Sequence, residues 1–207
     1  MIVRLGLRPP VKVTLIGIGP GRADAMTEEG MKALQEADFV IGSGRMLDCV
    51  RGKKPLLDAY CSEKIAGFID SHRGYERFAV LLSGDTGFYS GAKKLYQALT
   101  KSDTEDSVQI LTGVSSISYF AARLGTSWDD AVIASNHGRK QALIPLIRDH
   151  EKVFSILGKP EDAAELAQKL VGYGMAEVKL SVGERLSYAD EKITVGEAKE
   201  FCDFRHD

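Results

Sequence analysis

Alternation between strand-like and helix-like segments limits the fold of this chain more than any other feature. The run at 11–18 (VKVTLIGI) is apolar, rich in β-branched residues and followed by glycines, which is typical of a strand buried on both faces. Thr27 then opens a helical pattern in which Met31, Leu34 and Ala37 recur at three-residue spacing. The chain therefore begins with a strand, a glycine-rich loop and a helix.

The same alternation continues to the end of the chain. We expect further strands at 39–41, 78–82, 108–111, 131–134, 153–157 and 178–182. We expect further helices at 62–71, 92–100, 116–124, 141–150 and 160–171, and a last one near Ala198. Strands and helices in this order form a mainly parallel sheet with helices on both faces, so the predicted fold class is α/β.

The length of 207 residues allows one large domain or two small ones, since domains average roughly 150 residues. We place a boundary near residues 135–145. This predicts an N-terminal α/β domain at 1–140 with a mainly parallel sheet, and a C-terminal α/β domain at 141–207 with a smaller mixed sheet.

Composition argues against several classes of protein. A formal net charge of -2 provides no general attraction to nucleic acid, and the longest apolar runs are far shorter than the roughly 20 residues that cross a bilayer. Residues 1–10 lack the apolar core of a secretory signal. Cys49, Cys61 and Cys202 lie too far apart to indicate a disulfide framework or a CxxC metal site. We expect a cytoplasmic protein that binds neither nucleic acid nor membranes.

The loop at 17–21 (GIGPG) follows the first strand. Its glycines allow a ligand to approach the backbone closely, and Pro20 stiffens the bend. It is not a dinucleotide fingerprint, because Arg22 stands where GxGxxG requires glycine. A tight turn with no ligand is the alternative interpretation.

Two other strands end in loops of unusual composition. The loop at 83–91 (SGDTGFYSG) combines a carboxylate, hydroxyls, two aromatic rings and three glycines, and Asp85 fits either a ligand contact or a helix cap. In the loop at 113–116 (GVSS), Ser115 or Ser116 is expected to cap the next helix. Ligands bind outside the carboxyl ends of strands in open parallel sheets, so we expect all three loops to face one crevice.

A basic segment, 135–140 (SNHGRK), ends the last strand of the first predicted domain. His137, Arg139 and Lys140 beside a glycine favour anion recognition, although a solvated basic loop explains them equally well. The sequence contains no His/Glu/Cys constellation for a metal, no GxSxG elbow and no P-loop lysine motif. We therefore predict no metal site.

Taken in order, the segments VTLIGIGPG, SGDTGFYSG, TGVSSISYFAARLG with Trp128, and ASNHGR resemble the tetrapyrrole methylases, the class III S-adenosylmethionine-dependent methyltransferases. The resemblance runs over about residues 11–200. It implies two α/β domains with the cofactor between them, and a homodimer. The HGR segment is similar to the branch of the family that methylates C5 of corrinoid intermediates.

The resemblance also implies a set of site residues, but it identifies no catalytic residue. His137 is a candidate for accepting the proton released after methylation, with water as the alternative. The cofactor S-adenosyl-L-methionine, and its product S-adenosyl-L-homocysteine, would contact Pro20, Gly84, Asp85, Phe88, Ser115, Ser116, Leu157 and Leu186. The substrate would contact Gly19, Gly21, Tyr89, His137 and Arg139, with Lys140 at the rim.

The implied activity is methyl transfer from S-adenosylmethionine to C5 of a precorrin or cobalt-precorrin in cobalamin biosynthesis. A sister methylase acting at another ring carbon and a non-catalytic corrinoid-binding subunit are the alternatives. Expected partners are the corrinoid substrate, a second copy of the chain and a separate C15-methyltransferase/decarboxylase.

The sequence departs from the family pattern at two places. Thr86 stands where many relatives have proline, which changes the stiffness of the loop. The sequence also stops at 204–207 (FRHD), where relatives continue into a last apolar strand. Either the sequence is shortened or that strand is absent, and we expect the smaller sheet to lack an edge strand.

Overall fold

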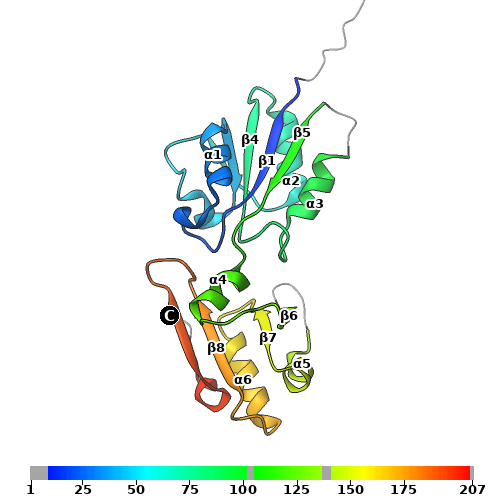
Figure 1. Ribbon diagram of the computed structural model, residues 1–207. Coiled ribbons are helices and arrows are strands. Elements are labelled where there is room, and N and C mark those ends of the chain that lie inside the picture. Colours follow the sequence, from blue (N-terminus) through cyan, green and yellow to red (C-terminus); the bar gives the residue numbers. More distant parts are fainter. Residues whose placement is uncertain (1–8, 102–104, 137–140, 206–207) are drawn as a thin grey trace, which may run out of the picture. The chain divides into compact units, whose positions relative to one another are not determined.

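The computed structural model describes residues 9–101, 105–136 and 141–205 (Figure 1). The chain forms two compact units, Met1–Ser116 and Ile117–Asp207. The first unit holds one five-stranded sheet in which every strand is parallel to its neighbours, in the order β3-β2-β4-β1-β5. This sheet consists of β1 (Lys12–Gly17), β2 (Phe39–Gly42), β3 (Leu56–Asp58), β4 (Arg77–Leu82) and β5 (Ser107–Leu111).

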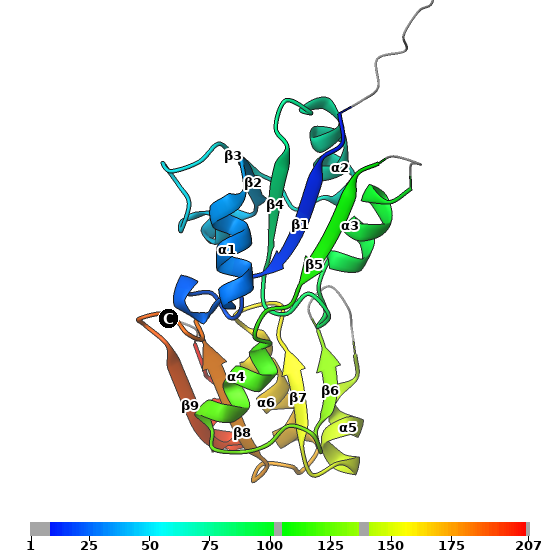
Figure 2. The same ribbon diagram turned by 45° about the horizontal axis from the view of Figure 1, so that its top comes forward.

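Helices cover both faces of this sheet, as the alternation predicts (Figures 1 and 2). Side chains of consecutive strand residues point to opposite faces, so Leu15 and Ile16 enter two different clusters of buried residues. Leu15 packs in the cluster that includes Ile65 of α2, and Ile16 in the cluster that includes Leu34 of α1. The helices are α1 (Glu28–Glu36), α2 (Ser62–Ser71) and α3 (Ala92–Leu99), with short 3-10 turns at Ala23–Ala25 and Gly44–Leu47.

The start of α1 confirms the helix predicted after the first loop. Thr27 Oγ1 accepts a hydrogen bond from the backbone N–H of Gly30 at 3.1 Å and so caps the helix. Gly30 is buried, and a Cβ at this position would lie 3.0 Å from Ile16 Cγ2. The helix therefore approaches β1 closely because glycine leaves room for it.

The second unit contains two separate pairs of strands. β6 (Val132–Ser135) and β7 (Val153–Ile156) are parallel, whereas β8 (Lys179–Glu184) and β9 (Lys192–Glu197) are antiparallel. Strands of both orientations are present, as expected of a mixed sheet. The helices are α4 (Ser116–Arg123), α5 (Leu143–Asp149) and α6 (Asp162–Gly172), and the helix expected near Ala198 is a 3-10 turn at Ala198–Phe201.

Three features differ from the sequence prediction. The units divide after Ser116 instead of near residues 135–145, because β6 pairs with β7, residue Val132 opposite Val153, and adds nothing to the five-stranded sheet. Strands β3 and β9 were not predicted. For the second unit, the sequence predicts one smaller sheet that lacks an edge strand. The structure instead has two separate pairs of strands, because β7 does not pair with β8 within the described part of the chain.

Cys49, Cys61 and Cys202 are all free thiols, as their spacing indicates. Within the residues that the structure describes, no helix has the length and apolar character needed to cross a membrane.

Candidate functional site

The loops after β1 and β4 are joined to each other by their backbones. β1 pairs with β4 on one side and β5 on the other, all in parallel, so the carboxyl ends of these strands lie at one edge of the sheet. Beyond this edge, the N–H of Gly19 donates to the carbonyl of Gly84 at 3.1 Å, and the N–H of Gly84 donates to the carbonyl of Gly19 at 2.9 Å. The first two predicted loops therefore meet in the first unit.

The third loop packs against the same two. A Cβ built on Gly113 would lie 2.3 Å from the carbonyl oxygen of Gly84 and 2.5 Å from that of Gly17. A Cβ on Gly17 would lie 2.6 Å from the backbone nitrogen of Gly113. Non-bonded atoms do not approach so closely, so only glycine fits at both positions. Gly17 and Gly113 were not among the predicted contact residues, although glycine at the carboxyl ends of two adjacent strands is the signal that identifies them.

Three glycines of these loops adopt backbone angles that favour glycine. Their φ angles are 75° for Gly19, 148° for Gly21 and 68° for Gly84. A Cβ on Gly19 would lie 2.8 Å from the carbonyl oxygen of Ala25, whereas no atom lies within 4 Å of a Cβ on Gly84. The backbone of Gly84 therefore borders open space. Pro20 lies between Gly19 and Gly21 and is half-buried.

Asp85 shapes its own loop and does not cap the following helix. Its Oδ1 accepts a hydrogen bond from the N–H of Gly87 at 2.6 Å, and its carbonyl accepts one from the N–H of Phe88 at 3.2 Å. Ser90 Oγ instead accepts from the N–H of Ala92, the first residue of α3. Asp85 therefore holds a tight turn at the carboxyl end of β4.

Two aromatic rings end this turn. The rings of Phe88 and Tyr89 meet edge to face with their centroids 5.1 Å apart. Tyr89 has a φ of 49°, an uncommon angle for a residue with a side chain, and its side chain is exposed. Backbone strain of this kind is found most often at binding and catalytic sites.

Ser115 and Ser116 lie where the third loop enters α4. Ser115 is buried, and Ser116 is the first residue of the helix. Nine of the predicted contact residues therefore belong to this group of three loops. They are Gly19, Pro20, Gly21, Gly84, Asp85, Phe88, Tyr89, Ser115 and Ser116.

The remaining predicted cofactor contacts belong to the second unit. Leu157 follows β7 and lines a cavity of that unit. Leu186 lies in the turn after β8, where Arg185 and Ser187 have φ angles of 47° and 71°. Leu186 packs over Gly183, since a Cβ on Gly183 would lie 2.8 Å from its Cδ2. Both leucines are half-buried.

Glu191 fixes the turn that carries Leu186. The N–H of Ser187 donates to Glu191 Oε2 at 2.7 Å, and Arg123 Nε donates to Oε1 at 2.7 Å. These bonds, the one from Ser187 above all, hold the pKa of Glu191 below its usual value.

We expect Glu191→Gln to destabilise the second unit in a pH-dependent manner. The pKa of Glu191 is lower in the folded chain than in the unfolded chain. Its contribution to stability is therefore present above the unfolded pKa of about 4.3 and is lost as the pH falls through the folded pKa. Urea unfolding at several pH values should give a larger free energy of unfolding for the wild type than for the variant near neutral pH. This difference should become smaller in acid. A difference independent of pH would contradict this role.

His137, Arg139 and Lys140 lie outside the described residues. Their flanking residues are tied together: the N–H of Gln141 donates to Asn136 Oδ1 at 3.0 Å, and the N–H of Ser135 donates to Gln141 Oε1 at 2.8 Å. No three His, Cys, Asp or Glu side chains gather as metal ligands would within 9–101, 105–136 and 141–205.

Comparison with known proteins identifies the family. The model of the Tetrapyrrole (Corrin/Porphyrin) Methylases matches residues 12–202. The chain belongs to this family. Among curated relatives of this methylase, a probable cobalt-precorrin-7 C(5)-methyltransferase of Methanocaldococcus jannaschii is 31% identical over 198 residues, covering 92% of the chain and 91% of the relative. The precorrin-6Y C(5,15)-methyltransferase [decarboxylating] of a Sinorhizobium species is 29% identical over 91% of the chain, which spans 46% of that protein.

Solved structures confirm the fold of this tetrapyrrole methylase. A cobalt precorrin-4 methyltransferase matches with a TM-score of 0.76 at 21% identity, over 93% of the chain and 87% of its own. The uroporphyrin-III C-methyltransferase of Thermus thermophilus, complexed with S-adenosylhomocysteine, matches with a TM-score of 0.71 at 18% identity, over 95% of the chain and 87% of its own.

Proposed function

We propose that this methylase transfers a methyl group from S-adenosylmethionine to C5 of a precorrin or cobalt-precorrin in cobalamin biosynthesis. The observation that carries the proposal is the meeting of three glycine loops at the carboxyl edge of the parallel sheet. The proposal of C5 as the acceptor is supported by the relatives from Methanocaldococcus and Sinorhizobium, whose names specify this carbon.

The residues of the first unit fit a cofactor of this kind. Gly17 and Gly113 let the three loops pack backbone against backbone, and the Cβ position of Gly84 faces open space, so a ligand can approach the backbone of Gly84 closely. Pro20, Gly84, Asp85, Phe88, Ser115 and Ser116 would hold S-adenosylmethionine from this unit. Leu157 and Leu186 would complete the contacts from the second unit.

Methyl transfer requires little of the protein beyond correct placement of the two reactants. When bound, S-adenosylmethionine supplies a methyl group on a positively charged sulfur, which is already a good leaving group. The loops need to align the reacting carbon with the methyl group and to exclude water. The rigid turn at Asp85 and the mutual bonds of Gly19 and Gly84 suit alignment, because neither depends on a mobile side chain.

The substrate would be a large ring with carboxylate side chains. Tyr89 presents an exposed aromatic ring on these loops, and Gly19 and Gly21 would be further contacts of the substrate ring. His137 and Arg139 would bind the carboxylates, with Lys140 beside them. The proton released from C5 would pass to His137 or to water.

A second polypeptide would complete the reaction sequence. The Sinorhizobium relative is named for both C5 and C15 methylation and for decarboxylation, and the chain spans 46% of it. We propose that a separate C15-methyltransferase/decarboxylase acts beside this chain, and that the chain itself is a cytoplasmic homodimer.

The test is incubation of the purified chain with labelled S-adenosylmethionine and a panel of corrinoid intermediates. NMR of the product should show the label on C5. Label on another ring carbon would identify a sister methylase. Corrinoid binding without any binding of S-adenosylmethionine would instead indicate a non-catalytic corrinoid-binding subunit.

We expect Asp85→Ala to weaken binding of S-adenosylmethionine about tenfold, which is about 1.4 kcal/mol, without unfolding the protein. The substitution removes the oxygen that accepts from the N–H of Gly87 and loosens the turn. Isothermal titration calorimetry measures the affinity, and thermal unfolding checks the fold.

Asp85→Asn is the matched control, because its side-chain oxygen can still accept from Gly87 while the charge is removed. If Asp85→Asn keeps the affinity for S-adenosylmethionine and Asp85→Ala loses it, the effect is due to the turn and not to the charge. An unchanged affinity in Asp85→Ala would refute the assignment of Asp85 to the cofactor site.

A further inference from the structure

The turn between β8 and β9 holds Leu186 in an uncommon backbone form. Arg185 before it and Ser187 after it have φ angles of 47° and 71°, in the left-handed region that favours glycine. Neither residue is glycine, so both angles cost free energy that other contacts of the turn must offset. The fold therefore keeps the backbone around Leu186 in this form against local strain.

Contacts within the turn supply part of this support. The N–H of Tyr188 donates to the carbonyl of Arg185, and the N–H of Glu191 donates to the carbonyl of Tyr188, both at 3.0 Å. The guanidinium of Arg185 lies over the ring of Tyr188, 5.5 Å from its centroid, and pairs with the carboxylate of Asp190. The turn is thus a compact structure that ends at Glu191.

The side chain of Glu191 attaches this turn to α4. Its Oε2 accepts from the N–H of Ser187, the residue after Leu186, at 2.7 Å. Its Oε1 accepts from Nε of Arg123 at 2.7 Å, and the carboxylate also accepts a hydrogen bond from the side chain of Tyr119. The side chain of Glu191 is only 12% exposed, so water competes little for these bonds. One carboxylate therefore joins the backbone next to Leu186 to a helix of the same unit.

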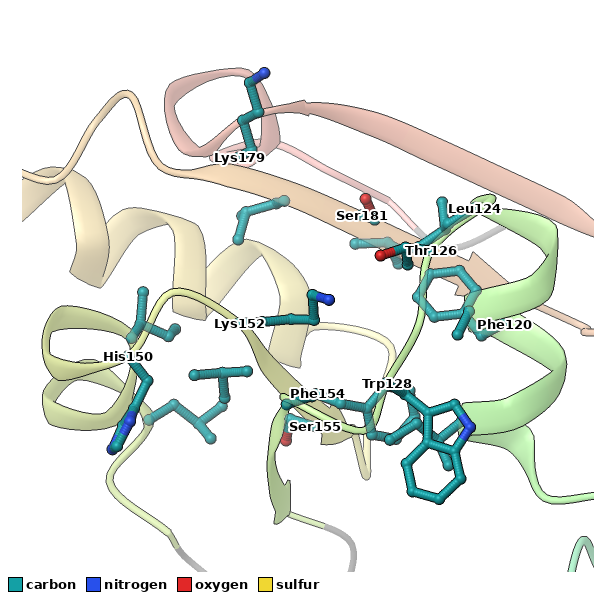
Figure 3. A pocket seen from close by; sticks show the side chains of 18 of the residues that line it. Phe120, Leu124, Thr126, Trp128, His150, Lys152, Phe154, Ser155, Lys179 and Ser181 are labelled. Carbon is teal, nitrogen blue, oxygen red and sulfur yellow. The ribbon is translucent and has the colours of Figure 1, made fainter.

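The side chain of Leu186 is placed by β8. A Cβ on Gly183 would lie 2.8 Å from Leu186 Cδ2 and 2.7 Å from Phe120 Cε2, so glycine leaves room for both side chains against the strand. Phe120 extends from α4 into the cavity of this unit (Figure 3). Packing on β8 thus places the side chain of Leu186, and the bond from Ser187 to Glu191 places its backbone.

We propose that Glu191 is a positioning residue for the cofactor, which acts by holding Leu186 where S-adenosylmethionine would contact it. The inference rests on the proposed function, in which Leu186 is a cofactor contact. Leu186 can offer the cofactor only apolar surface, and such a contact is lost when the turn moves. A turn that is fixed before binding also lowers the entropy cost of binding. Glu191 needs no contact with the cofactor for this role.

Two substitutions at Glu191 separate positioning from stability. Glu191→Met keeps a side chain of similar length but removes both acceptor oxygens, so the dissociation constant for S-adenosylmethionine should rise about tenfold. Glu191→Gln keeps an oxygen that can accept from Ser187, so the constant should change by less than about threefold even though this variant is less stable. Calorimetric titration and thermal unfolding are the measurements. Dissociation constants that follow the melting temperature in both variants would overturn the proposal.

A double-mutant cycle tests whether Glu191 acts through Leu186. Leu186→Ala alone should raise the dissociation constant about tenfold, because it removes the apolar contact. Adding Glu191→Met to Leu186→Ala should raise the constant by no more than about a further twofold. Additive effects would contradict the proposal, as would an unchanged constant in Leu186→Ala.

Asp190→Asn is the matched control. Asp190 lies in the same turn, its side chain is 60% exposed, and it pairs with Arg185. Its dissociation constant should stay within about twofold of the wild-type value. Should Glu191→Met not fold, Glu191→Asp takes its place in both experiments, because its carboxylate is one carbon–carbon bond shorter and is drawn back from Ser187.

The same titrations distinguish this assignment from the proposed function. A wild type that binds no S-adenosylmethionine would refute both. A wild type that binds it, with equal dissociation constants in all Glu191 variants, would refute the positioning role alone and leave methyl transfer to be decided by the labelled product.

Discussion

Replacing Gly113 with alanine should abolish binding of S-adenosylmethionine and destabilise the first unit by about 3 kcal/mol, at the upper end of the cost of overpacking. The new methyl carbon would lie 2.3 Å from the carbonyl oxygen of Gly84 and 2.5 Å from that of Gly17. Both obstacles are backbone atoms held by a strand or by hydrogen bonds, so neither can rotate away as a side chain would. Urea unfolding and calorimetric titration of the cofactor measure the two effects.

Gly91→Ala is the matched control for this experiment. Gly91 lies in the same loop system, has an ordinary φ of -72°, and has no atom within 4 Å of a Cβ position. Alanine there should leave stability within about 0.5 kcal/mol of wild type and should leave cofactor binding intact. Similar results for both variants would show that crowding at Gly113 is not the cause.

Asp106→Ala should destabilise the chain by about 3 to 5 kcal/mol, the cost of removing one partner of a buried ion pair. Asp106 accepts from both terminal nitrogens of Arg73, at 2.9 and 2.8 Å, and from the N–H of Val11 at 3.0 Å. The two side chains are only 11% and 12% exposed, and the bonds to Asp106 raise the pKa of Arg73. The change would leave a charged guanidinium largely buried, with the exposed Asp70 as its remaining acidic partner.

The exposed pair of Arg51 and Asp48 provides the comparison. Their side chains are 57% and 64% exposed, so water already solvates both charges. Asp48→Ala should therefore change the free energy of unfolding by less than about 1 kcal/mol. Chemical denaturation of both variants under one set of conditions is the measurement. Equal losses would mean that burial adds nothing at Asp106.

Much of the fold follows from the sequence because its strongest segments are buried on both faces. β1 and β4 are apolar along nearly their whole length and end in glycine loops, so their positions are clear from the pattern. β3 is only three residues long, too short for any periodicity. β9 has the pattern KITVGE with partly exposed residues throughout, so no apolar run indicates it. Both were missed for these local reasons.

The domain boundary could not be predicted from local pattern alone. β6 follows β5 and α4 in the same strand-helix alternation, so the sequence pattern places it in the first sheet. Its pairing partner, however, is β7, which lies later in the chain. Pairing between distant segments is a tertiary choice that periodicity does not encode.

The sequence predicts which loops form the candidate site better than it predicts the contacts of individual side chains. Parallel strands with adjacent carboxyl ends indicate where the three loops gather, and the structure confirms their meeting in the first unit. The sequence is compatible with two roles for the side chain of Asp85, a ligand contact or a helix cap. Its side chain bonds to Gly87 because α3 begins seven residues later, at Ala92, beyond its reach.

The paired bonds between Gly19 and Gly84 have a consequence for how these loops tolerate change. Both bonds run from main chain to main chain, so they are indifferent to the side chains on either loop. A substitution at Thr86 therefore leaves both bonds available, and the two loops stay joined. A substitution can alter what the loops touch, but separating them requires a change to the peptide backbone itself.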